Sequence, residues 1–265
     1  MKIAIVNTER HEPLPDLAGS CPACGAPMIS KCGTVKVWHW AHRATRHCDP
    51  WWENETEWHR AWKAEFPIQW QEIIHTAPTG EKHIADVKTD SGWVIEFQHS
   101  YLKAPERAAR EAFYTKLIWV VDGLRRKRDA NHIINAWQYG APIGQNSQIK
   151  GVPIDGSALL RDWSVSKTPV FFDLGDSKVI WWKISSGKSG AAYLFPYSRD
   201  KFLNVQKGTD PEATRQFENF VFSIPTLVTN FENPTPEKAP EPIRNQIPPE
   251  RRHPFASITR RNFRF

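Results

Sequence analysis

The clearest hydrophobic pattern along the chain lies between residues 53 and 121. Large apolar residues recur at every fourth position from Trp58 to Phe66, and a proline follows, so the spacing predicts an amphipathic helix over 53–66. Alternating or fully apolar runs, separated by turn residues, then predict three strands in PIQWQEIIH, HIADVKT and WVIEFQ. A second helix in APERAAREAFYTK and a buried strand in LIWVV complete the pattern. The predicted order is therefore helix, three strands, helix and strand.

Weaker patterns flank this segment. The start of the chain predicts one short strand in KIAIV, and the Gly- and Pro-containing residues 138–157 are typical of a linker. Three apolar runs, PVFFDLG, KVIWWKIS and AAYLFPYS, predict an antiparallel meander, and PEATRQFENFVF predicts a helix after it. The last 33 residues hold seven prolines and seven Lys or Arg against three acids, which indicates a flexible basic tail. We therefore expect four parts, with the bounds 1–52, 53–140, 141–232 and 233–265.

Composition and charge narrow the class of protein. Hydrophobic residues make up 40% of the 265 residues and charged residues 24%, as in ordinary soluble proteins. No apolar run reaches the ~18 residues that a membrane helix needs, so we expect no membrane partner. The start, MKIAIVNTERHEP, has too few apolar residues for a signal peptide, which favours a cytoplasmic protein. The formal net charge of +6 favours a polyanionic partner such as nucleic acid.

All four cysteines lie in one short segment, between residues 21 and 48, which in a reducing compartment favours a metal site over disulfides. In CPACG, two thiols three residues apart can turn toward one tetrahedral ion, and a glycine eases the turn. The second pair of ligands must come from KCGTVKVWHWAHRATRHC. Two of its histidines are three residues apart and would face opposite sides of a strand, so only one of them is expected to bind. The favoured set for structural zinc is Cys21, Cys24, His42 and Cys48, with Cys32, His39 or His47 as replacements, and the alternative is reduced cysteines without metal.

An acidic hairpin is the second candidate for chemistry. If DSG at 90–92 forms a three-residue loop with its glycine in the left-handed conformation, Asp86 lies opposite Glu96, and Gln98 shares the face of Glu96. Two opposed carboxylates repel, and a divalent cation between them removes the repulsion, because hard oxygen ligands suit Mg²⁺ or Mn²⁺. Glu57 on the preceding helix adds a third acid. The pattern indicates a metal-dependent phosphodiesterase site, and the alternative is a solvated polar face on which acids coincide.

Several stretches of the chain resemble the CoiA-like competence protein family, a branch of the PD-(D/E)XK nuclease superfamily. They are CPACG, WHWAH, ETEWHRAWK, IADV, IEFQHS and REAFY followed by LIWVVDG, and they run from residue 21 to about residue 121. The resemblance implies a restriction-endonuclease-like core of helix, three strands, helix and strand. With a small N-terminal zinc knuckle and a C-terminal β-containing module, the expected fold class is α/β (α+β). Residues from about 140 onward lie outside the resemblance.

The resemblance also implies the roles of individual residues. It implies metal-dependent cleavage of DNA, with Asp86 and Glu96 as ligands of Mg²⁺ or Mn²⁺. It places Gln98 where most of the superfamily has lysine, and an amide can orient water or phosphate but carries no charge for a developing oxyanion. The implied catalytic set is Glu57, Asp86, Glu96 and Gln98, and the supporting positions are His59, Arg110 and Tyr114.

Three functions fit these observations. The expected one is hydrolysis of DNA phosphodiester bonds by a Mg²⁺- or Mn²⁺-dependent nuclease of competence or DNA-processing type. A catalytically silent DNA-binding adaptor on the same fold and a nuclease that acts on RNA are the alternatives. Acids at positions 57, 86 and 96 favour the enzyme over the adaptor, because an adaptor has no need of them.

Overall fold

The computed structural model describes residues 1–44, 48–51, 55–143, 146–188 and 190–233, without the side chains of residues 146 and 147. The expected basic tail, 233–265, lies outside the described residues except for Asn233. None of the helices in this part of the chain is long and apolar enough to cross a membrane.

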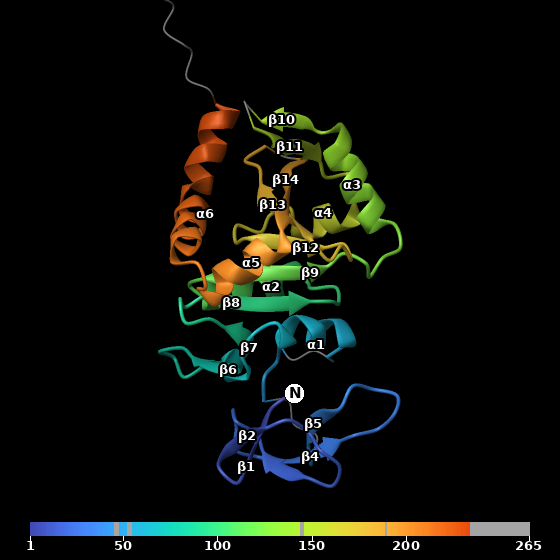
Figure 1. Ribbon diagram of the computed structural model, residues 1–265, viewed down its shortest axis with the longest axis vertical. Coiled ribbons are helices and arrows are strands. Elements are labelled where there is room, and N and C mark those ends of the chain that lie inside the picture. The colour runs from blue at the N-terminus through green and yellow to red at the C-terminus, as the bar shows by residue number, and fades with distance from the viewer. Residues whose placement is uncertain (45–47, 52–54, 144–145, 189, 234–265) are drawn as a thin grey trace, which may run out of the picture. The chain divides into compact units, whose positions relative to one another are not determined.

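The first 42 residues fold into a five-stranded antiparallel sheet, drawn in blue in Figure 1. Its strands are β1 (Ala4–Val6), β2 (Glu9–His11), β3 (Ala18–Ser20), β4 (Pro27–Lys31) and β5 (His39–His42), in the order β2-β1-β3-β4-β5. Of these, the hydrophobic pattern predicts only β1. Met28 and Trp40 form the centre of a small separate core. A core of this size contributes little stability, which makes a metal cross-link valuable here.

The rest of the described chain is organised around a nine-stranded sheet in the order β10-β11-β14-β13-β12-β9-β8-β7-β6 (Figure 1). Its strands are β6 (Gln71–Thr76), β7 (Lys82–Lys88), β8 (Val94–Gln98), β9 (Leu117–Asp122), β10 (Ala141–Ile143), β11 (Asn146–Pro153), β12 (Val170–Asp173), β13 (Val179–Ser185) and β14 (Ala191–Ser198). β9 pairs in parallel with β8 and β12, and the other neighbours are antiparallel. The predicted meander is confirmed as β12, β13 and β14.

Helices cover both faces of this sheet. One face carries α1 (Glu57–Ala64), a 3-10 turn (Ile68–Trp70), α5 (Arg199–Lys207) and α6 (Pro211–Glu232), and the other carries α2 (Ala104–Phe113), α3 (Asp129–Tyr139) and α4 (Ala158–Trp163). Trp62 of α1, Phe202 of α5 and Phe217 of α6 share the first core. Ile133 of α3 and Leu160 of α4 belong to the second. The order predicted between residues 53 and 121 is confirmed as α1, β6, β7, β8, α2 and β9.

Two expectations fail after residue 137. The predicted linker 138–157 contains the end of α3 and the paired strands β10 and β11. Its Gly140 serves close packing, because an added Cβ would lie 2.9 Å from the carbonyl oxygen of Gly151. The expected boundary between 53–140 and 141–232 is also absent. β12 pairs with β9, and each of the two cores contains residues from both sides of that boundary. Residues 1–233 form one compact unit. The fold is mixed α/β with two sheets.

Candidate functional site

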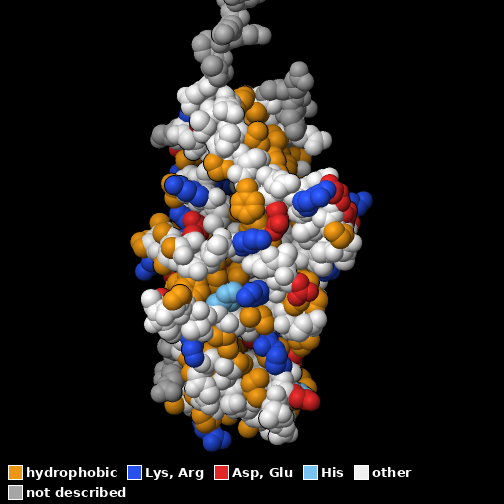
Figure 2. Space-filling view, turned by 90° about the vertical axis from the view of Figure 1, so that its left-hand side faces the viewer, with side chains coloured by type: hydrophobic (Ala, Val, Ile, Leu, Met, Phe, Trp, Pro, Cys, Tyr) orange, Lys and Arg blue, Asp and Glu red, His pale blue; other side chains and the backbone are white. Residues whose placement is uncertain are grey.

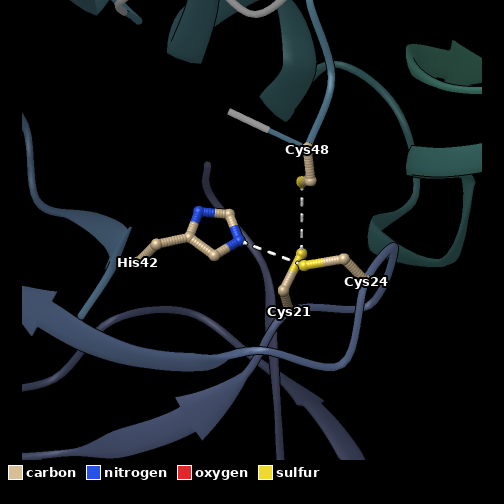
Figure 3. Close-up of side chains that lie close together, drawn as sticks. All are labelled: Cys21, Cys24, His42 and Cys48. Carbon is tan, nitrogen blue, oxygen red and sulfur yellow. Dashed lines mark hydrogen bonds between the residues drawn. The ribbon is translucent and has the colours of Figure 1, made fainter. Parts of the chain in front are cut away.

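The four predicted zinc ligands point toward one another in the N-terminal segment (Figure 3). The Sγ atoms of Cys21 and Cys48 are 3.7 Å apart, and the Sγ of Cys24 lies 3.4 Å from the Nε2 of His42. All four donor atoms lie within 4.8 Å of one another. Tetrahedral zinc with its usual bond lengths needs about 3.8 Å between two sulfur atoms and about 3.6 Å between sulfur and nitrogen. The spacing of the group therefore fits a zinc ion.

Local backbone geometry explains how the ligands meet. Directly after β3, the N–H of Cys21 donates to the carbonyl of Ala26 (2.8 Å) and the N–H of Gly25 donates to the carbonyl of Cys21 (2.8 Å). Gly25 has a φ of +69°, which glycine adopts without strain, so CPACG closes as a tight turn. His42 ends β5, next to this turn, whereas His39 at the other end of β5 contacts the backbone instead. Position along the strand therefore decides which histidine joins the group.

We expect the purified protein to contain one tightly bound zinc per chain. Burial, reinforced by the neighbouring Cys21, raises the pKa of the Cys48 thiol to about 12, so zinc binding must release protons and should weaken at low pH. Cys21→Ser or Cys24→Ser should lose the metal and unfold the N-terminal sheet, while Cys32→Ser, outside the group, serves as the control. Elemental analysis of protein prepared without chelator measures this, and a zinc content near zero would refute the prediction.

The predicted hairpin joins β7 to β8 with the expected register. The N–H of Thr89 donates to the carbonyl of Trp93 (2.9 Å), which closes a three-residue loop. Gly92 in that loop has a φ of +85°, the left-handed conformation that such loops require. Val87 then pairs with Ile95. Counting one residue further along each strand places the two predicted metal ligands opposite each other.

Asp86 and Glu96 occupy these opposed positions, and the strand ladder opens between them. The N–H of Phe97 donates to the Oδ2 of Asp86 (3.0 Å) rather than to a strand carbonyl. Both carboxylates line a narrow pocket with a volume of about 60 Å³ that water can occupy. We name this space the acid pocket. Its charged lining residues are Asp49, Glu55, Lys63, Glu72, Asp86, Glu96 and Arg110.

Glu96 is the most perturbed acid of the pocket. It is 5% exposed, its Oε2 lies 3.4 Å from Nη1 of Arg110, and its buried Oε1 has no hydrogen-bond partner among the described residues. Burial, with Asp86 as the second cause, raises the pKa of Glu96 to about 8. Without a cation, burial therefore favours the protonated form of this carboxyl.

This raised pKa predicts how stability depends on pH. An acid whose pKa rises from 4.5 to about 8 on folding binds its proton more tightly in the folded state, so it disfavours folding increasingly between those two pH values. Glu96→Gln should therefore melt at a higher temperature than the parent at pH 8.5 without added Mg²⁺ or Mn²⁺, and at nearly the same temperature at pH 4. Thermal melts of both proteins between pH 4 and pH 8.5 test the sign of this difference in melting temperature. A variant that is less stable than the parent at pH 8.5 would contradict the assigned cause.

Lys63 is a pocket residue that the sequence pattern missed. Its ammonium lies 2.8 Å from Oδ1 of Asp86, 2.7 Å from Oε1 of Glu55 and 3.4 Å from Oε1 of Glu72, and the side chain is almost fully buried. These carboxylates raise the pKa of Lys63 well above its ordinary value against the effect of burial, so it stays charged. Lysine normally faces solvent, and only its position one turn after His59 on α1 could have drawn attention to it.

Glu57 is the one predicted catalytic residue that the structure does not bring to the acid pocket. Its side chain is exposed in the first turn of α1 and lines a separate cleft. Glu55 lies in the pocket instead, where its Oε1 contacts Lys63 and its Oε2 contacts Arg60 (2.6 Å). Glu55 precedes the N-cap residue Thr56, so helical periodicity carries no signal for it.

Two further acids tie the N-terminal segment to the acid pocket. The carboxylate of Glu72 accepts the backbone N–H groups of Lys2 (2.6 Å) and Ile3 (2.8 Å), and the φ of Glu72, +48°, is uncommon outside glycine. Asp49, one residue after the last zinc ligand, accepts the N–H of Ile84 (2.8 Å). The zinc-binding segment therefore forms part of the wall of the acid pocket.

Of the remaining predicted residues, His59, Gln98 and Arg110 line the acid pocket, while Tyr114 lies outside its lining. Nε2 of Gln98 donates to the carbonyl of Ser100 (3.1 Å), which fixes the orientation of the amide. Burial, with Glu96 as the second cause, raises the pKa of Tyr114 far above its ordinary value, so its phenol stays neutral. Tyr114 therefore packs behind the site.

One family model matches part of the chain: competence protein CoiA, N-terminal domain, matches residues 19–50. The match contains all four residues of the Cys and His group and ends before α1. No curated protein and no solved structure matches the chain. The resemblance expected from residue 21 to about 121 is thus confirmed in its first part, and beyond residue 50 it stays a prediction. Over residues 19–50, the chain matches the N-terminal domain of the competence protein CoiA, with a zinc-finger-like group of three cysteines and one histidine.

Proposed function

We propose that this protein is a Mg²⁺- or Mn²⁺-dependent nuclease that hydrolyses DNA phosphodiester bonds in the cytoplasm, in a competence-related process. The observation that carries the proposal is the opposed pair of Asp86 and Glu96, in which the buried Oε1 of Glu96 has no partner among the described protein groups. A buried carboxylate without a partner is costly, and a hard cation satisfies it. The CoiA match supports the competence-related context.

The residues present fit a divalent cation. Mg²⁺ at sites that act on phosphates is commonly held by one or two carboxylates, with water and phosphate as further ligands, so Asp86 and Glu96 suffice. When bound, such an ion lowers the pKa of a water molecule and offsets charge on the phosphate. The acids lie on the second and third strands after α1, which supports a PD-(D/E)XK-like core as the resemblance implies.

The protein's own groups hold the acids in place. The Lys63 ammonium fixes Oδ1 of Asp86 while the N–H of Phe97 fixes Oδ2. Arg110 pairs with Oε2 of Glu96, and Oε1 has no hydrogen-bond partner among the described residues, so it can take a cation as its ligand. The amide of Gln98, held by Ser100, can orient water or a phosphate oxygen. These contacts support a preorganised site.

The direct test is cleavage by the purified full-length protein. It is stripped of metal at the acid pocket with a mild chelator, checked for retained zinc, and incubated with linear, circular, single- and double-stranded DNA with and without Mn²⁺ or Mg²⁺. Cleavage of at least one form only with added metal supports the proposal. A folded, zinc-loaded protein that leaves every form intact overturns it.

A catalytically silent DNA-binding adaptor is favoured by one specific observation. Lys63 and Arg110 already offset the charge of the opposed acids, so the fold itself does not require a catalytic cation. Surface charge does not decide between the two functions: Figure 2 shows a face on which Lys and Arg side chains stand singly among hydrophobic and acidic ones. An adaptor would bind DNA without cutting it, with or without Mn²⁺.

A further inference from the structure

We propose that the acid pocket takes a single DNA strand, and that residues 33–39, which lead into β5, form the mouth through which this strand reaches the acids. The inference rests on the proposed nuclease function and names its substrate class. It follows from the narrow access to the acids and from the chemistry of the segment beside that access.

The acids are too enclosed for an intact duplex. The side chain of Asp86 is 21% exposed, and Glu96 and Gln98 are buried. Met1 and Trp51 of the N-terminal segment close further sides of the pocket. A phosphate in a duplex belongs to a backbone that is fixed to a paired strand, whereas a single strand can bend into a narrow site.

A wider cleft adjoins the acid pocket and supplies the access. It offers about 360 Å³, and Met1 and Glu55 belong to the walls of both spaces. Its remaining walls are the segment that leads into β5, with Lys36 and His39, and the start of α1, with Glu57. This volume is in the range of sites for nucleotide-sized molecules. We name this space the mouth cleft.

The segment at the mouth cleft has the composition of a single-strand contact surface. From residue 31 to residue 43, KCGTVKVWHWAHR contains three Lys or Arg and no acid. Val35 is 93% exposed and Trp38 is 44% exposed. Proteins hold single strands by cations along the backbone and by aromatic side chains on which bases stack. Lys36, which lines the mouth cleft, and Trp38, an exposed residue of the same segment outside that lining, provide one group of each kind.

The mouth segment is held against α1. The carbonyl of Trp38 accepts Nη2 of Arg60 (2.7 Å), and Nε of the same arginine donates to Glu55 of the acid pocket (2.6 Å). Within the segment, Nε1 of Trp38 donates to the carbonyl of Gly33 (3.2 Å). Arg60 therefore links the segment that lines the mouth cleft to Glu55, a residue of the acid pocket.

Substrate form tests the proposal. Labelled oligonucleotides of one sequence, as single strand, blunt duplex and single-stranded RNA, are incubated with the full-length protein and Mn²⁺, and binding is followed by anisotropy with Ca²⁺ in place of Mn²⁺. We expect the DNA single strand to be cut at least ~10-fold faster and bound more tightly than the duplex. Equal or faster cutting of the duplex or of the RNA overturns the proposal. If no form is cut, the proposed nuclease function is wrong. The anisotropy measurements then still test the mouth cleft, because tighter binding of the single strand than of the duplex supports it and equal or weaker binding contradicts it.

Variants locate the contact. Trp38→Ala should weaken single-strand binding by ~5- to 150-fold, the range found for loss of one stacked base, while Trp38→Phe keeps a ring and should bind within a few-fold of the parent. Lys36→Glu should also weaken single-strand binding, by a factor that grows as the salt concentration falls. Lys167→Glu changes an exposed lysine before β12 and should leave single-strand binding unchanged. Retained zinc and an unchanged melt confirm that each variant is folded. Parent-like binding by both folded Trp38→Ala and Lys36→Glu overturns the proposal.

Discussion

Asp86→Asn and Glu96→Gln are each expected to reduce metal-dependent DNA cleavage to the metal-free background. Each change keeps the shape of the side chain but removes a charged oxygen ligand from the acid pocket at the place where β7 and β8 oppose the two acids. Neither variant should unfold. Asp86→Asn leaves Lys63 paired with Glu55 and Glu72, and Glu96→Gln replaces a carboxyl whose protonated form burial already favours. The measurement is single-turnover cleavage with Mn²⁺, alongside a thermal melt.

The hairpin itself supplies the matched control. Asp90 is an exposed acid in the turn between the same two strands, and Asp90→Asn should cut DNA like the parent. Cleavage by Asp86→Asn at the parent rate would show that the site is elsewhere. A parent protein without cleavage, together with Asp86→Asn and Glu96→Gln variants that bind DNA like the parent, is the pattern of the adaptor.

Lys63→Met is expected to be the most destabilising single change in the acid pocket. It removes the charge that three carboxylates share, on Glu55, Glu72 and Asp86, while leaving those carboxylates in place. Removing one partner of a buried ion pair costs about 3–5 kcal/mol, which corresponds to a fall in Tm of ~6–20 °C for a unit of this size. Denaturant and thermal unfolding of the zinc-loaded protein at pH 7 measure the loss.

The pH dependence of this loss has a defined sign. Burial acts to raise the pKa of Glu55, but Lys63 and Arg60 outweigh it and lower that pKa to about 2. A lowered acid pKa contributes stability above the unfolded value of 4.5 that is lost as pH falls toward 2, so parent and Lys63→Met should converge in acid. Lys103→Met, at an exposed lysine, should change stability by less than ~0.5 kcal/mol. An unchanged melt for Lys63→Met would mean that Lys63 does not neutralise the acids.

The parts of the site that depend on short spacing were predictable. The three-residue loop ending at Gly92 fixes which residues of β7 and β8 are opposed, because strand pairing repeats every two residues from the turn outward. The CPACG turn fixes Cys21 and Cys24 in the same way. The alternation of side chains along a strand predicted that only one of His39 and His42 would bind, and the structure places His42 with the thiols.

The contacts that cross the chain were not predictable from spacing. Lys63 meets Glu72 and Asp86 only because α1 packs beside β6 and β7, and Glu72 meets Lys2 only because the N-terminal strand lies against β6. A helical lysine and a strand glutamate each look like solvated residues when taken alone. The expectation that Glu57 would join the acids failed for the same reason, since the side chain of Glu57 is exposed in the first turn of α1 while Glu55 lines the pocket.

The amino-acid sequence by itself determined the order of α1, β6, β7, β8, α2 and β9, the register of the acidic hairpin and the four residues of the zinc group, because each depends on local periodicity or on a turn. The tertiary structure decided that β12 extends the same sheet beyond β9, that the zinc-binding segment closes the acid pocket, and that Lys63 and Arg110 offset the charge of Asp86 and Glu96. These features depend on which distant surfaces exclude water together, and the charge of a buried group can be balanced only by partners that the fold brings to it.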